Sequence, residues 1–476
     1  MHCSLTGMRP DFISGNRQTR RNQMHFKTAA IAAAMFVTLA YSASAEDYAP
    51  APPAPPEAGE TAQMPEPAPG SAITLRQALA LALEKSPALK AYSLEIRARE
   101  ARAIQEGLLP NPDVEAFVED FGGTGSVEGF KGVETTILLS QLVPWSGRIS
   151  KQRKVAGLDA GLAGWDYEAA RLDVLTDTAK AFADLVAAEK RLAIMEELDS
   201  LSQRVYDTVA EKADAGEISP IQKKRAGVAH SQVEIRLART KREVEAARKA
   251  LAATWGSTRA NFGKAEGSLD TLLPVPPYED LADYIDTNPD VARWAAEMEK
   301  REAVLSLERS RAIPEPVVSG GYRRIGENDD NAFVVGLSIP LPIFDRNQGA
   351  IAEARRLVTK GEHERREAEV SVSASLAAAY AELQSSYEAA SMLKRDVVPR
   401  AEEAYASIFE GYREGKFSLL DVLDAHRTVF DTELEYVDSL RSYHRALADV
   451  ERLTGSPLGE MRAWPETSHA EEGDSK

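Results

Sequence analysis

The sequence predicts a mainly α-helical protein with a small β part, in which one unit of long antiparallel helical hairpins and two short strands occurs twice. Three observations support this fold class. Turn and proline motifs recur at an offset of about 200 residues, which is typical of an internal duplication. The segments between them carry helical spacing over unusual lengths, and short runs within each copy alternate as β-strands do.

Composition excludes several classes of protein. The chain has 476 residues and a formal charge of −17. This charge argues against wrapping nucleic acid, because clustered basic residues are needed to replace phosphate counterions. The one cysteine, Cys3, excludes a disulfide framework and a multi-cysteine metal site. Outside the N-terminal region no run of about 20 apolar residues occurs, so an ordinary helical membrane protein is not expected.

The N-terminal segment is predicted to be a cleaved export signal. A short basic start at 24–27 precedes an apolar stretch at 28–40, and Ala-Ser-Ala at 43–45 supplies the small residues that signal peptidase needs. Met24 is a possible true start. The alternative, a single transmembrane anchor, would need a longer apolar core. Cleavage removes the lone cysteine, so none remains in the mature chain for lipidation.

Five landmarks of the first copy recur in the same order in the second. They are Ser86-Pro87 with Asn288-Pro289, Leu109-Pro110 with Ile313-Pro314, Pro144 with Pro342, Gly216 with Gly415, and Gly256 with Gly455. The predicted organisation is a signal peptide at 1–45, a Pro/Ala-rich linker at 46–72, a first repeat at 73–258, an inter-repeat linker at 259–277, a second repeat at 278–458 and a flexible acidic tail at 459–476. The proline-rich linker is expected to be extended, since it cannot pack a core; a ligand for a proline-reading domain is the alternative.

Each copy is predicted to begin with a short helix, at 75–85 or 278–287, followed by a second helix with proline in its first turn. Two strands come next. In the second copy the alternating apolar residues are Phe333, Val335, Leu337, Ile339 and Leu341; in the first copy Val133, Ile137, Leu139 and Val143 share a face with Thr135 and Gln141. This period of two predicts strands with a largely apolar face.

A very long helix is expected after each strand pair, with Ser146 or Asp345 as its N-cap. In the first copy it runs without proline for some 65 residues, which at 1.5 Å per residue reach about 100 Å. Its apolar residues repeat every seven positions, as in a coiled coil. Pro399 interrupts the second copy, where we expect a kink or break. After the turns at Gly216 and Gly415 an antiparallel helix returns.

The strands suggest insertion into an outer membrane. Four strands of this length match those that cross a bilayer in barrels, but open strand edges cannot face lipid. Three chains would supply about twelve strands, enough for a closed barrel. The alternative is a small soluble sheet that caps a helical bundle. Export, the lack of disulfides and the apolar strand faces favour the membrane.

Several motifs resemble a known family. Residues 73–78 (Ile-Thr-Leu-Arg-Gln-Ala), Ser86-Pro87 and Leu-Pro-Asn-Pro at 109–112 resemble the TolC-type outer-membrane efflux proteins. The run at 336–349, Gly-Leu-Ser-Ile-Pro-Leu-Pro-Ile-Phe-Asp-Arg-Asn-Gln-Gly, is similar to the CzcC-like branch, which is associated with heavy-metal cation export. The resemblance covers about residues 73–458, including the duplication.

The resemblance implies a homotrimer, with a twelve-stranded β-barrel in outer-membrane lipid continued by a periplasmic α-helical barrel. It implies a passive exit duct of a tripartite efflux pump. A periplasmic adaptor (membrane fusion protein) would dock the duct to an inner-membrane transporter of the resistance-nodulation-division type. Heavy-metal cations are the expected cargo. Drug efflux, type I protein secretion and a soluble periplasmic coiled-coil scaffold remain alternatives.

A periplasmic gate is expected where the second hairpin turns back. Asp421 and Asp424 are three residues apart and share a helical face. The resemblance implies that they line the narrowest part of the tunnel, where a ring of about six carboxylates would attract cations. Gln222 and Arg225 occupy the matching places in the first copy, and Arg225 could pair with an acid of the neighbouring hairpin. The alternative is an acidic pair on a solvated helix face.

The two hairpin turns are also expected to face the adaptor. The resemblance implies contact at Gly216, Ser219, Gly415 and Ser418, where small side chains permit close approach. Simple turn glycines explain the same residues equally well.

No catalytic constellation occurs in the sequence. The histidines of the mature chain are scattered over helical positions without ligand spacing, so no metal site and no cofactor are expected. There is no P-loop or nucleophile elbow. The chain is therefore not expected to be an enzyme, and the energy for export must come from a partner.

Overall fold

The computed structural model describes residue 68 and residues 70–414 and 416–455. The predicted signal peptide, most of the predicted linker at 46–72, the tail at 459–476 and Gly415 lie outside the described residues.

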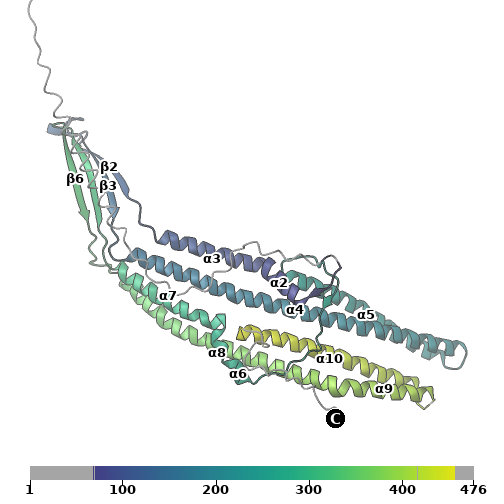
Figure 1. Cartoon of the computed structure of the whole chain (residues 1–476). Helices are drawn as coiled ribbons and strands as arrows, with labels where there is room; N and C mark the ends of the chain where they lie inside the picture. The colour runs from purple at the N-terminus through teal and green to yellow at the C-terminus, as the bar shows by residue number, and fades with distance from the viewer. Residues whose placement is uncertain (1–67, 69, 415, 456–476) are drawn as a thin grey trace, which may run out of the picture. The chain divides into compact units, whose positions relative to one another are not determined.

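The described chain is mainly α-helical with a small β part, as the sequence predicts (Figure 1). The first copy contains β1 (Ile73–Thr74), α2 (Leu75–Lys85), α3 (Pro87–Glu106), β2 (Asp113–Glu119), the 3-10 turn η1 (Gly125–Val127), β3 (Glu134–Leu142), α4 (Arg148–Asp214) and α5 (Pro220–Thr254). After β4 (Ala265–Glu266), the second contains α6 (Tyr278–Ala282), the 3-10 turn η2 (Ile285–Thr287), α7 (Pro289–Arg311), β5 (Val317–Ile325), β6 (Asp330–Ser338), α8 (Gln348–Met392), the π-helical turn η3 (Leu393–Val397), α9 (Val398–Arg413) and α10 (Leu419–Thr454).

The N-caps predicted for the two long helices are wrong. Gly147 and Asn347 occupy these positions instead, in the left-handed conformation, with φ of 71° and 57°. Glycine and asparagine adopt this conformation most readily, which suits the turn from strand into helix. Ser146 donates its hydroxyl to Glu315 Oε1 at 2.8 Å, so its side chain joins the two repeats rather than capping α4.

The predicted break near Pro399 is confirmed as a π-helical turn. α8 passes into η3, and α9 follows with Pro399 in its first turn. A proline removes one backbone hydrogen bond and displaces the preceding turn, which the wider π-turn accommodates. Lys394 in this turn donates its ammonium group to the carbonyl of Asp270 at 3.3 Å. The break is therefore tied to the segment between the repeats.

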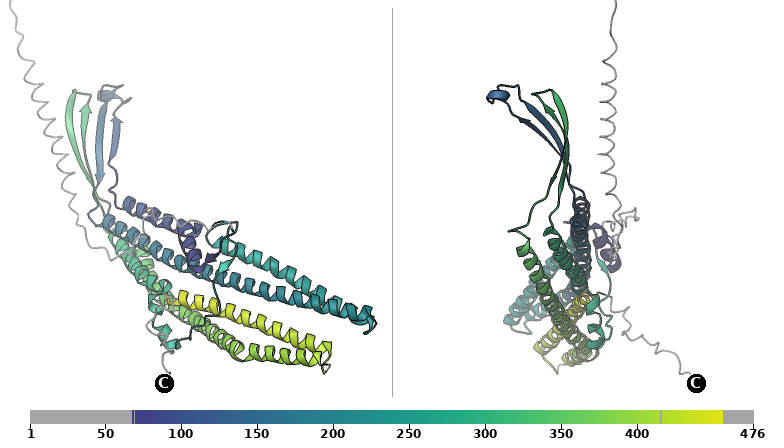
Figure 2. Two further views of the ribbon diagram at one scale, coloured as in Figure 1. Left: turned by 45° about the vertical axis from the view of Figure 1, so that its right-hand side comes forward. Right: turned by 90° about the vertical axis from the view of Figure 1, so that its left-hand side faces the viewer.

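The two repeats are joined along α4, which packs against α3, α5, α7 and α10. α5 returns along α4, and α10 returns along α9 and α8, as Figures 1 and 2 show. Asp184 of α4 accepts from Arg441 and Arg445 of α10 at 2.6 and 2.7 Å. Among the helices that the structure describes, none combines the length and the hydropathy needed to span a membrane.

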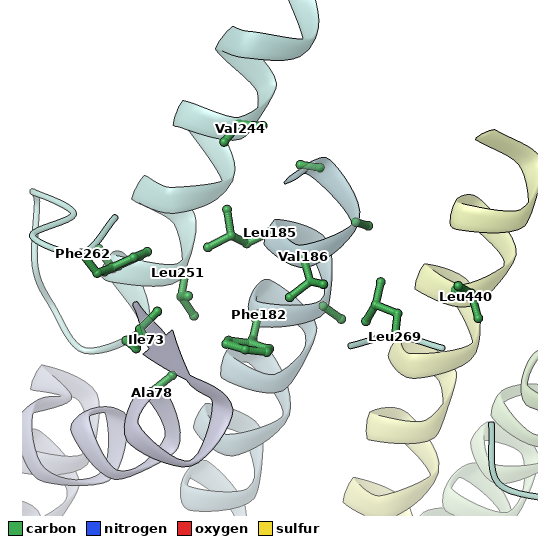
Figure 3. Packing of buried hydrophobic residues seen from close by; sticks show 14 of the residues in the cluster. Ile73, Ala78, Phe182, Leu185, Val186, Val244, Leu251, Phe262, Leu269 and Leu440 are labelled. Atoms are coloured by element: carbon green, nitrogen blue, oxygen red, sulfur yellow. The ribbon is translucent and has the colours of Figure 1, made fainter. Parts of the chain in front are cut away.

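The main apolar core lies halfway along α4. Phe182 and Leu185 are buried there with Leu251 of α5 and Leu440 of α10 (Figure 3). The inter-repeat segment at 259–277 contributes buried side chains of its own, Phe262 and Leu269 among them. This segment is thus a packed part of the core that also fastens the second repeat to the first.

A smaller core holds the second repeat together near α6 and α10. Leu281, Leu376, Leu383 and Tyr443 are buried in it. The Tyr443 hydroxyl accepts from the backbone N–H of Leu273 and donates to its carbonyl, both at 3.0 Å. Both backbone groups of a half-buried residue of the inter-repeat segment are thereby satisfied.

Four strands form one antiparallel sheet in the order β2-β3-β5-β6, so the hairpins of the two repeats pair through β3 and β5. In this register Thr136 lies opposite Arg323 and Ile137 opposite Tyr322. β1 and β4 form a separate, short parallel pair beside the main core. The large sheet leads directly into α4 and α8, whereas the hairpin turns lie at the far ends of α4 and α9 (Figure 1).

Candidate conduit surfaces and hairpin turns

One face of the four-stranded sheet is apolar and exposed. Residues paired across antiparallel strands project to the same side, so the register assigns each side chain to a face. The apolar face carries Val114 and Val118 of β2, Ile137 and Leu139 of β3, Val318 and Tyr322 of β5, and Phe333, Val335 and Leu337 of β6. These side chains are 37% to 84% exposed. A patch of this kind is typical of a surface that meets lipid or a partner.

The predicted alternation is confirmed within the strands, but two of the predicted runs are too long. β6 ends at Ser338, so Ile339 and Leu341 follow it as exposed residues of the connection to α8. Val133 and Val143 likewise lie just outside β3. Pro340 and Pro342 account for the early end of β6, because proline cannot donate to a ladder.

The opposite face, here called the charged face, carries every carboxylate of the four described strands. These are Asp113, Glu115, Glu119, Glu134 and Asp330, and they share the face with Thr136, Ser140, Ser319 and Arg323 and with apolar side chains that include Phe117 and Leu138. Arg323 pairs with Glu134 at 3.1 Å and donates to Thr136 Oγ1 at 3.0 Å. The two faces of the sheet are therefore suited to different surroundings, one apolar and one aqueous.

The turn of the second hairpin gives its two aspartates different surroundings. Ser418 is the N-cap of α10, and Asp421 Oδ2 accepts from both the backbone N–H and the hydroxyl of Ser418 at 2.7 Å. These hydrogen bonds, that of the hydroxyl first, lower the pKa of Asp421. Asp424 lies one turn further on with an exposed side chain, and its carbonyl accepts from Thr428. The two aspartates are therefore not equivalent, and the Ser-x-x-Asp spacing at 418–421, a capping signal, is the sequence feature that distinguishes them.

The turn of the first hairpin also leads into a helix that begins with a serine cap. Gly216 has a φ of 78°, Ser219 is the N-cap of α5, and its hydroxyl accepts from Ile221 N at 3.4 Å. Across the turn Lys223 donates to both carboxylate oxygens of Asp214 at 2.8 and 2.9 Å. Hydrogen bonding to Asp214 raises the pKa of Lys223.

Gln222 and Arg225 lie three and six residues after Ser219, the N-cap of α5. Asp421 and Asp424 lie three and six residues after Ser418, the N-cap of α10. The two pairs therefore occupy matching positions. The side chains of Gln222 and Arg225 are exposed. Within the described part of the chain no hydrogen bond or ion pair joins them to the two aspartates. The four predicted gate residues are therefore not brought together within one copy.

His426 is a residue near the second turn whose setting the sequence did not indicate. Its ring lies 5.0 Å from that of Tyr405 on α9 and 4.3 Å from that of Phe430. Burial, reinforced by the charge of Arg204 on α4, lowers its pKa to about 4. In the described chain no group of three His, Cys, Asp or Glu residues is placed to hold a metal ion.

We predict that acid loosens the second hairpin through His426. An unfolded histidine titrates near pH 6.5, so the fold favours the neutral ring. Its contribution to stability is complete above about pH 6.5 and is lost progressively as the pH falls towards about 4. Hydrogen-exchange protection of the amides around Tyr405 and His426 should therefore fall between pH 7.5 and pH 5.

The variant His426→Leu should remove most of this pH dependence in the same range. His363→Leu, which replaces an exposed histidine of α8, is the matched control and should behave like the native chain. An unchanged pH profile in His426→Leu would contradict the assignment.

Comparison with known proteins identifies the family. The family model of the outer membrane efflux protein matches residues 78–257 and 281–456, which together make up most of the chain. The chain belongs to the outer membrane efflux protein family. This membership confirms the resemblance found in the sequence and the predicted outer-membrane location, and it agrees with a channel rather than an enzyme.

Two relatives and one solved structure are similar to the protein. It is 32% identical over 384 residues to the cobalt-zinc-cadmium resistance protein CzcC of Cupriavidus metallidurans, covering 80% of this chain and 90% of the relative. It is 26% identical over 287 residues to the nickel-cobalt-cadmium resistance protein NccC of Alcaligenes xylosoxydans xylosoxydans, covering 60% of this chain and 64% of the relative. A crystal structure of CusC superposes with a TM-score of 0.68 at 16% identity, covering 86% and 99% of the two chains, and confirms the fold.

Proposed function

We propose that this outer membrane efflux protein is the exit channel of a tripartite efflux pump and passively conducts heavy-metal cations to the exterior. The sheet carries the proposal, because its exposed apolar face would meet lipid while its charged face would line an aqueous passage. The similarity to CzcC, a cobalt-zinc-cadmium resistance protein, supports metal cations as the cargo.

The functional form is a homotrimer closed through the edges of the sheet. β2 and β6 are the outer strands, and each pairs on one side only. Unpaired strand edges cannot face lipid. If β6 of one copy pairs with β2 of the next, three copies form a ring of about twelve strands without edges.

The helices also carry exposed apolar side chains that would be buried between neighbouring copies of the trimer. Ile221, Val228 and Ile235 follow one another at seven-residue spacing on α5 and are 53% to 70% exposed. Met392 of α8 and Phe409 of α9 are exposed on the second hairpin. In the closed ring α5 of one copy would lie against α8 and α9 of the next, which would bury both sets.

The double variant Val228→Asp/Ile235→Asp is expected to weaken the trimer by at least roughly tenfold, because burial of each of these side chains is worth about 1.5–3 kcal/mol. Native mass spectrometry in detergent would measure the trimer fraction as the protein is diluted. Thr258→Asp/Thr271→Asp adds the same two charges at exposed positions in and beside the inter-repeat segment, outside both apolar sets, and should leave the trimer intact. Equal trimer stability of the double variant and this control would contradict the arrangement.

The hairpin turns are the proposed docking site for a periplasmic adaptor, which links the channel to an inner-membrane transporter of the resistance-nodulation-division type. Gly216, Ser219 and Ser418 are exposed at the two turns, and Gly415, outside the described residues, completes the proposed set. Ile221 and Phe417 expose apolar side chains beside them, which gives the turns apolar surface for a partner.

The periplasmic gate is proposed at Asp421, Asp424, Gln222 and Arg225. Since Asp421 is engaged at its own helix cap, Asp424 is the carboxylate available to project into the passage. Arg225, which makes no ion pair within the described chain, would pair with an acid of a neighbouring hairpin in the trimer. A ring of carboxylates with such partners would favour cations and hold the turns together at rest.

For the gate, Asp424→Ala should lower cation selectivity and raise the resting conductance of the reconstituted channel several-fold. Arg225→Ala should raise the resting conductance without lowering cation selectivity, because it removes a closing contact but no carboxylate. Single-channel recording in planar bilayers would measure both. Asp207→Ala, at an exposed position about two turns before α4 ends, serves as control. Native selectivity and native closure in Asp424→Ala would argue against the gate.

The protein would be exported by cleavage of the signal peptide at 1–45, with no cysteine left for lipidation. The repeats at 73–258 and 278–458 would each supply one strand pair and one helical hairpin of the channel, with the segment at 259–277 between them.

Deletion of the gene tests the function as a whole. A deletion strain should stop growing at several-fold lower concentrations of cobalt, zinc or cadmium salts and should retain more metal, and a plasmid copy should restore both. Drug tolerance is measured in parallel. Increased sensitivity to drugs alone would reassign the cargo, and recovery of the protein in the soluble periplasmic fraction would instead support a scaffold.

A further inference from the structure

The charged face of the sheet contains a single cationic side chain in its four described strands. Five carboxylates project from this face, and Arg323 of β5 is the only arginine or lysine among them. Glu119 and Glu134 lie directly opposite each other on β2 and β3. Like charges in this relation repel each other, so this pair would be costly without a counterion.

Arg323 supplies that counterion across three strands. One guanidinium nitrogen lies 3.1 Å from Glu134 and another 3.7 Å from Glu119, while Nε donates to Thr136 Oγ1 at 3.0 Å. Thr136, directly opposite Arg323, is only 1% exposed. The guanidinium is therefore held at a defined position beside both carboxylates, with 37% of its side chain still exposed.

The next residue, Arg324, provides a natural comparison. It projects to the apolar face, because successive strand residues alternate between faces. It pairs with Asp329 of the β5–β6 turn at 2.6 Å, and its side chain is 63% exposed. The two arginines thus carry the same charge at adjacent positions but face opposite sides of the sheet.

We propose that Arg323 determines the ion selectivity of the outer part of the passage, by offsetting one of the two negative charges of Glu119 and Glu134 so that cations pass without being retained. This inference rests on the proposed function, in which the charged face lines the passage. Rings of carboxylates raise the local concentration of cations. Without Arg323, about six carboxylates of a trimer would lose the three guanidinium groups that they share at one level of the passage.

Reversal potentials in planar bilayers under a potassium chloride gradient test this role with the full-length channel. Arg323→Gln should shift the reversal potential towards the potassium equilibrium potential, and the shift should grow at low salt, where screening is weaker. Arg324→Gln, the matched control with the same change in charge, should not shift it. Arg323→Lys keeps the charge and should stay near the native value.

A second set of variants separates charge from structure. Arg323→Gln/Glu134→Gln should return towards the native reversal potential, because the unpaired carboxylate is removed with its counterion. Glu134→Gln alone should shift the potential in the opposite direction, away from potassium. This variant also tests the inference if Arg323→Gln does not insert into the bilayer.

The outcomes distinguish this inference from the function on which it rests. A native chain that forms no pore overturns both. A conducting native pore overturns the inference alone if Arg323→Gln behaves like Arg324→Gln, or if Arg323→Lys shifts the potential as strongly as Arg323→Gln. Where Arg323→Gln does not insert, an unchanged reversal potential in Glu134→Gln overturns it equally.

Discussion

The packing of both repeats against the middle of α4 is the interaction on which the rest of the structure depends. Phe182 and Leu185 bury apolar surface against the inter-repeat segment and α5, and Asp184 beside them binds Arg441 and Arg445 of α10. Apolar burial supplies most of the stabilisation, at about 25 cal/mol per Å², and the two arginines orient α10 on α4. Since both hairpins extend from this joint, their turns lie near each other at one end (Figures 1 and 2).

The four-stranded sheet differs from the helices, because contacts within one chain leave its two outer edges unpaired and its apolar face exposed. A folded sheet with a broad exposed apolar face and two unpaired edges is unfavourable in water. Both features become favourable once the edges pair between copies and the apolar face meets lipid. The same alternation that makes one face apolar gathers the carboxylates on the other, so membrane insertion and an acidic passage arise from one pattern.

Much of the architecture was predictable because the signals are local. The recurrence of Gly216 and Ser219 as Gly415 and Ser418 marks two hairpin turns, and Pro399 marks the break in the second long helix. Local signals also led to errors where two neighbouring residues could both occupy the N-cap position. Ser146 is a good capping residue, but Gly147 can adopt the left-handed conformation and takes the cap position, while Ser146 bonds to Glu315 of the other repeat.

The candidate sites were only partly predictable, because the spacing of residues does not show which partners their side chains contact. The spacing of Asp421 and Asp424 places both on one helical face, yet it does not reveal that the first is held by Ser418 while the second is exposed. Phe430 lies one turn after His426 on the same helix, but the other aromatic neighbour of His426, Tyr405, belongs to another helix. Contacts between side chains of different helices depend on tertiary packing, and the spacing of residues along the chain does not reveal them.

The sequence by itself determined the duplication, the long hairpins and the alternation that sends Arg323 and Arg324 to opposite faces. These properties depend on residues close together in the chain, whose periods of 3.6 and 2 set the direction of each side chain. Only the tertiary structure decided which carboxylates Arg323 meets. Glu119 and Glu134 are about 190 to 200 residues away along the chain, and the register of β3 against β5 brings them within reach.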